Sequence, residues 1–80
     1  MQKTEKPTRL SVVMPRQHLS ELESEITKVT TGPGLRVAKT IDERKPHAHT
    51  LRLELEGDQH RVAAFIKWVN FRAIRVTVVA

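Results

Sequence analysis

The sequence predicts an α+β domain with the ferredoxin-like βαββαβ arrangement: a four-stranded antiparallel sheet with two helices on one face. Apolar residues alternate with polar ones in four short segments, as in half-buried strands, and recur every three or four residues in two others, as in amphipathic helices. Right-handed crossovers then give the spatial strand order 4-1-3-2 and leave the second sheet face open. The 80 residues, 39% of them hydrophobic, fit one domain over residues 9–80, after a flexible lead-in of residues 1–8.

The first half of the chain predicts a strand, a helix and a second strand. Residues 9–14 alternate, and Pro15 suits the first turn of the helix that follows. The apolar stripe of that helix consists of Leu19, Leu22, Ile26 and Val29. Gly32 is expected to take the left-handed C-cap, and Pro33 prevents continuation of the helix. Residues 35–41 then form the second strand.

The second half predicts a strand, a helix and a closing strand. Residues 42–48 form a charged connection, and residues 50–56 alternate without a fault. Asp58 is placed to cap the second helix, whose core stripe consists of Val62, Phe65, Ile66 and Val69. The β-branched residues 73–79 close the chain as a strand.

Composition limits the function classes. The chain has no cysteine, which excludes disulfides, Cys-based zinc sites and thiol chemistry. No apolar run reaches the ~18 residues of a membrane span, and the polar start is no secretion signal, so a cytoplasmic protein without membrane contact is expected. The sequence shows no recognisable catalytic set of a nucleophile, a base and a group that orients the base, so neither enzyme activity nor a cofactor is expected. The formal charge of +5 and the pI of about 10.3 attract anions.

The last third of the chain resembles the NIL domain, a small ACT-like module with a ferredoxin-like fold. The strand LRLELEGD (51–58) and the segment VAAFIKWVNFRAIRVTVV (62–79) carry the resemblance, although Ala73 stands where the family commonly has glycine. The resemblance implies a non-catalytic regulatory or adaptor module that binds a small ligand or a protein partner and assembles as a homo-oligomer. In ACT-like folds small ligands lodge between the first strand and the first helix, here Met14 to His18, where Arg16 could add a charged fork.

Strand alternation predicts a row of arginines on the open sheet face. If the leucines of the strands face the helices, the opposite parity exposes Arg9, Arg36, Arg52 and Arg75. This row is a candidate surface for a phosphorylated ligand, an acidic protein or nucleic acid, and a basic nucleic-acid-binding module is the alternative function. No strand carries an aromatic residue, so base stacking on the sheet is not expected. The other interpretation is that Glu54 and its neighbours pair with these arginines across strands.

Two histidines and two aromatic residues complete the candidate sites. His47 and His49 are weak candidates for metal binding, because two imidazoles without a third ligand do not make a site; we expect solvated loop histidines. Trp68 and Phe71 are candidates for partner contact. Alternatively, Trp68 caps the edge of the core and Phe71 folds back over the last helical turn.

Overall fold

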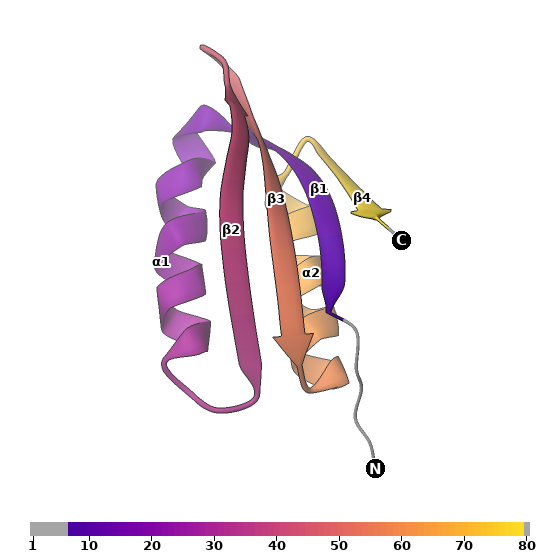
Figure 1. The fold of residues 1–80 in the computed structure, drawn as a ribbon. Coiled ribbons are helices and arrows are strands. Elements are labelled where there is room, and N and C mark those ends of the chain that lie inside the picture. The colour runs from indigo at the N-terminus through magenta and orange to yellow at the C-terminus, as the bar shows by residue number, and fades with distance from the viewer. Residues whose placement is uncertain (1–6, 80) are drawn as a thin grey trace.

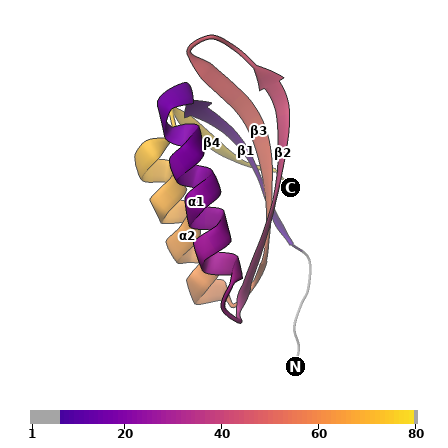
Figure 2. The same cartoon turned by 90° about the vertical axis from the view of Figure 1, so that its left-hand side faces the viewer.

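The computed structural model describes residues 7–79 and has the predicted ferredoxin-like topology (Figure 1). Residues 1–6 of the predicted lead-in lie outside the described residues, and Thr8, also predicted to belong to it, is the first residue of β1. All strand pairs are antiparallel in the order β2-β3-β1-β4, which confirms the predicted order. Both helices cover the same face of the sheet (Figure 2). The elements are β1 (Thr8–Pro15), a 3₁₀ turn (Arg16–His18), α1 (Leu19–Thr30), β2 (Leu35–Arg44), β3 (Ala48–Gly57), α2 (Gln59–Arg72) and β4 (Arg75–Val79).

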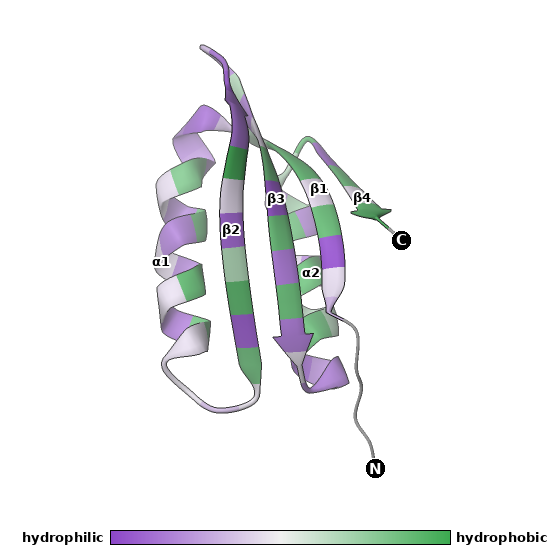
Figure 3. Cartoon of the chain, in the orientation of Figure 1, coloured by the Kyte–Doolittle hydropathy of each residue, from purple (hydrophilic) through white to green (hydrophobic). Residues whose placement is uncertain are grey.

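The core lies between the sheet and the helices. Apolar and polar residues alternate along β1 and β3 (Figure 3), so every second side chain is buried beneath the helix layer. The helices contribute Leu22 from α1 and Phe65 and Val69 from α2. The buried apolar residues of the strands are Leu10, Val12, Met14, Leu35, Leu51, Leu53 and Leu55. This single cluster stabilises the domain and fixes which strand residues face outward.

The β2–β3 hairpin is longer than predicted. Pairing continues from Leu35 opposite Gly57 to Arg44 opposite His49, with a bulge between Ile41 and Glu43. The backbone N–H of Lys45 donates to the carbonyl of Ala48 at 3.1 Å, which closes a short turn. The connection predicted over residues 42–48 is therefore only three residues long, because cross-strand pairing outweighs its charged composition.

The sequence predicted that the first helix begins directly after Pro15, and the structure corrects this prediction. Pro15 is the last residue of β1, and a 3₁₀ turn precedes α1, which begins at Leu19. The N–H of Arg16 donates to the carbonyl of His47 at 3.0 Å. This bond ties the end of β1 to the β2–β3 turn.

Backbone conformation corrects one glycine prediction and confirms one cap. Gly32 does not take the left-handed conformation; Gly34, with φ 99°, and Gly57, with φ 142°, have positive φ. The Asp58 side chain accepts the N–H of His60 at 2.8 Å, which confirms the predicted cap of α2. The closing strand begins at Arg75 and not at residue 73, because the N–H of Ala73 still bonds to the carbonyl of Val69 at 2.8 Å.

Candidate functional site

An open cleft of about 490 Å³ lies on the helix side of the domain, between the second half of α1 and the part of α2 from Arg61 to Trp68. Its volume falls within the range of small-molecule sites, ~300–1,000 Å³. The apolar part of its lining consists of Val29, Leu35, Ala64, Phe65 and Trp68. The sequence showed the two helical stripes but not the distance between the helices, so this cleft was not predicted.

Aromatic stacking holds the wall formed by α2. The rings of Phe65 and Trp68 stack with centroids 6.0 Å apart and an interplanar angle of 16°. The Arg72 guanidinium lies 4.2 Å from the centroid of the Trp68 ring, a cation–π distance. Arg72 also forms an ion pair at 3.6 Å with Glu21 of α1. Trp68 is therefore held at the edge of the core. This position agrees with the alternative given above, in which Trp68 caps the core edge.

The rim of the cleft carries two cations and one carboxylate. Lys28 and Glu25 come from α1, and Arg61 comes from the first turn of α2. The Arg61 side chain lies against Gly34, where an added Cβ would be 2.9 Å from its Cδ and Nε atoms. Neither Arg61 nor Lys28 forms an ion pair with any residue in the range 7–79. An apolar floor with unpaired cations at its edge suits a ligand with an apolar body and an anionic group.

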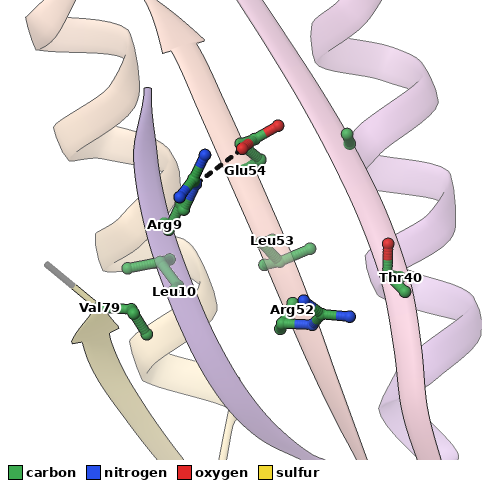
Figure 4. Close-up of a pocket in the computed structure, with 8 residues that line it drawn as sticks. Arg9, Leu10, Thr40, Arg52, Leu53, Glu54 and Val79 are labelled. Carbon is green, nitrogen blue, oxygen red and sulfur yellow. Dashed lines mark hydrogen bonds and ion pairs between the residues drawn. The ribbon is translucent and has the colours of Figure 1, made fainter. Parts of the chain in front are cut away.

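The open sheet face carries the four arginines that alternation predicted. The register places Arg9 opposite Glu54, Arg52 opposite Thr40, Arg36 opposite Glu56 and Arg75 opposite Val13. These positions have the opposite parity to the buried leucines, and all four arginines are exposed. Arg9 and Arg52 line a hollow of about 480 Å³ on this face (Figure 4).

Carboxylates on the open face pair with two of these arginines. Arg9 Nε donates to Glu54 Oε2 at 2.8 Å, and Arg52 Nε contacts both Asp42 oxygens at 3.0 and 2.9 Å. Glu56 adds a third carboxylate opposite Arg36. Within the described residues, Arg36 and Arg75 form no ion pair. The open face is therefore close to neutral. This agrees with the alternative interpretation of the sequence, in which carboxylates pair with the arginines across strands.

The positive excess is instead concentrated on α2. Residues 59–72 contain Arg61, Lys67 and Arg72 and no carboxylate. By contrast α1 carries Glu21, Glu23 and Glu25 against Lys28 alone. The absence of acidic residues from 59–72 is visible in the sequence and was the signal that sequence reasoning missed. Unpaired cations beside the cleft attract an anion there, whereas carboxylates pair with two of the arginines on the open face.

The Glu23 carboxylate of α1 forms an ion pair with a lysine of the sheet. Lys39 Nζ donates to Glu23 Oε2 at 2.6 Å. This hydrogen bond, together with the positive charge of Lys39, lowers the pKa of Glu23 below its ordinary value of 4.5. The pair ties α1 to β2 and leaves neither group free for a ligand.

Two of the remaining candidates, Arg16 and Phe71, are exposed. Arg16 is exposed, but its N–H is bonded to His47, so the strand–helix junction does not offer that N–H to a ligand. The 3₁₀ turn there spans three residues, and the N-terminus of α1 follows it at His18 and Leu19. Phe71 does not fold back over the helix: its side chain is 87% exposed. It therefore remains available for contact with a partner.

The two histidines do not share a site. His47 lies in the exposed turn, whereas His49 lies in β3 with 7% of its surface exposed. The His49 Nδ1 atom is buried and has no hydrogen-bond partner. Among residues 7–79, no group of three or more His, Asp or Glu side chains is close enough together to hold a metal ion. His49 therefore belongs to the core and is not a solvated loop histidine.

Replacing His49 with leucine is expected to stabilise the domain by about 1 kcal/mol, because leucine removes the unsatisfied buried nitrogen and keeps the apolar contacts. The free energy of unfolding in urea, measured by circular dichroism, checks this. His47→Leu in the exposed turn is the control and should change little. A destabilised His49→Leu protein would mean that the imidazole makes a favourable contact in solution.

No helix within the described range is both long and apolar enough to cross a membrane. The chain was also compared with protein-family models, with curated proteins and with solved structures, and no significant match was found in any of the three.

Proposed function

We propose that the chain is a non-catalytic regulatory or adaptor module that binds a small ligand or a protein partner in the cleft between α1 and α2. The observation that carries this proposal is the combination of an apolar cleft wall with the unpaired cations Lys28 and Arg61. The resemblance of residues 51–79 to the NIL domain supports a binding role in a homo-oligomer.

The chemistry of the lining favours binding over catalysis. Glu25 is the carboxylate of the lining, and the Thr31 hydroxyl already donates to the carbonyl of Lys28 at 2.8 Å. No nucleophile in the lining lies beside a base that could activate it. The ligand class that fits is an amphipathic anion: an aromatic or aliphatic carboxylate, or an acidic segment of a partner protein with an apolar anchor.

Trp68 provides a direct test, because it is the single tryptophan of the chain and it lines the cleft. We expect 1-naphthalenesulfonate to change Trp68 fluorescence saturably, and neutral 1-naphthalenemethanol to bind several-fold more weakly. Arg61→Glu should weaken binding of the anion about tenfold, since it removes one charge contact and adds a repulsive one. Lys67→Glu, also on α2 but outside the cleft lining, is the matched control.

The control separates a local contact from the general field of the protein. If Lys67→Glu weakens binding as much as Arg61→Glu, the probe responds to net charge and not to the cleft. An absence of saturable change in Trp68 fluorescence up to millimolar probe would contradict the proposed site.

A nucleic-acid-binding module is the second candidate, and the observation in its favour is that Arg36 and Arg75 remain unpaired on the open face within residues 7–79. Fluorescence anisotropy of a labelled single-stranded oligonucleotide tests it. This function requires affinity at low salt that falls steeply with added salt and with Arg36→Ala or Arg75→Ala. Within the same residues, Arg9 and Arg52 of this face are already paired with carboxylates, whereas both cations of the cleft are unpaired, which favours the cleft.

A further inference from the structure

The β4 side of the sheet leaves apolar surface uncovered. Val78 lies opposite the fully buried Leu10 and therefore has the parity of the helix-covered face, yet it is 65% exposed. Ile74, just before β4, is 64% exposed. Val76, between them, is half-buried against the core. The helix layer thus ends before the outer strand, and a row of apolar side chains that faces the core elsewhere in the sheet faces solvent here.

The two edges of the sheet differ in how they are protected. Edge strands expose unpaired backbone groups, and soluble proteins block them with charges, bulges or short strands. The β2 edge carries a bulge after Ile41 and the charged residues Asp42, Glu43 and Arg44. The β4 edge has no register shift within its described pairing and carries one charged residue, Arg75. Only its length of five residues limits further pairing.

The sequence of β4 is complementary to itself in one antiparallel register. With a two-fold axis at Thr77, threonine lies opposite threonine and Val76 lies opposite Val78 of the second copy. Both valine pairs then fall on the helix side of the sheet, where cross-strand β-branched pairs are stabilising. A two-fold axis perpendicular to the sheet keeps the helices of both copies on the same side.

Charge selects this register over the alternatives. Each Arg75 lies opposite Val79 of the other copy, so the two Arg75 positions are about 14 Å apart along the strands at ~3.4 Å per residue. This separation exceeds the screening length of ~8 Å at physiological ionic strength. An in-register parallel pairing would instead place the two arginines side by side, which is destabilising.

We propose that the β4 edge is a self-association surface, through which a second copy of this chain extends the sheet across a two-fold axis at Thr77. The inference deepens the homo-oligomeric part of the proposed function and does not depend on what the helix cleft binds. Backbone hydrogen bonds between the edges supply the pairing, and the exposed Val78 gains a partner in Val76 of the other copy.

A single introduced cysteine tests the geometry, because the chain has no cysteine of its own. In the proposed dimer the two Thr77 Cβ atoms are ~4.5–5.5 Å apart, close to the range that a disulfide can bridge. Thr77→Cys is expected to form a disulfide-linked dimer under mild oxidation at least about tenfold faster than Arg75→Cys, whose positions are too distant. Light scattering of the unmodified protein should show a concentration-dependent dimer.

Val78→Lys tests the contact without endangering the fold, because the side chain is mostly exposed in a single copy. It is expected to shift the protein to monomer while the circular dichroism spectrum and the Trp68 response to the naphthalenesulfonate probe are unchanged. A strictly monomeric unmodified protein, or equal cross-linking of Thr77→Cys and Arg75→Cys, would overturn the proposed interface. Loss of probe binding with an intact dimer would instead count against the cleft alone.

Discussion

Replacing Gly57 with alanine is expected to destabilise the domain by more than about 3 kcal/mol, a large part of the ~4–12 kcal/mol typical of a chain this long. Gly57 has φ 142°, a conformation that residues with a Cβ rarely adopt. An added Cβ would overlap the carbonyl oxygen of Gly34 and lie 2.9 Å from its carbonyl carbon. Both obstacles are backbone atoms, which cannot rotate away as a flexible side chain can.

The position of Gly57 explains why the strain cannot be relieved locally. Gly57 pairs with Leu35 at the start of β2, and the neighbouring Asp58 N–H donates to the carbonyl of Gly34 at 2.8 Å. Moving the strands apart would therefore break this bond and disturb the cap of α2. Urea unfolding measures the loss. Gly32→Ala is the control, since Gly32 has no positive φ and open space around its Cα; equal stability of the two variants would contradict the argument.

The contact between Gly34 and Gly57 also shows what the sequence could not predict. Strand order and core residues follow from alternation, because a period of two assigns every second side chain to one face. The segment TGPG offers two glycines, and local preference favoured Gly32 as the left-handed residue. The choice of Gly34 follows from its contact with β3, more than twenty residues later in the chain. The conformational preferences of the TGPG segment alone cannot predict a contact with a distant strand.

The same division holds for the candidate sites. The parity of β1 and β3 predicted correctly that Arg9 and Arg52 share the open face. The partner of Arg52 could not be predicted, because Asp42 lies where the register shifts between Ile41 and Glu43. The cleft depends on the separation of α1 and α2 above the sheet, which side-chain volumes across the whole core determine.

Leu22→Ala is expected to cost about 3 kcal/mol, because it leaves a cavity in the core beneath α1. Leu22 is the fully buried residue of α1, and its removal weakens the packing of this helix on the sheet. The same helix supplies Lys28 and Val29 to the cleft. The variant should therefore unfold at lower urea concentration and, while still folded, bind the naphthalenesulfonate probe more weakly.

Leu19→Ala is the comparison variant that distinguishes the loss of stability from the loss of probe affinity. Leu19 is only half-buried at the start of the same helix. The substitution should cost roughly half as much, in proportion to the smaller apolar area that it loses. If Leu22→Ala lowers stability as expected but leaves probe affinity unchanged, the wall formed by α1 does not contribute to binding. The ligand would then be held by α2 alone, through Arg61 and the stacked rings of Phe65 and Trp68.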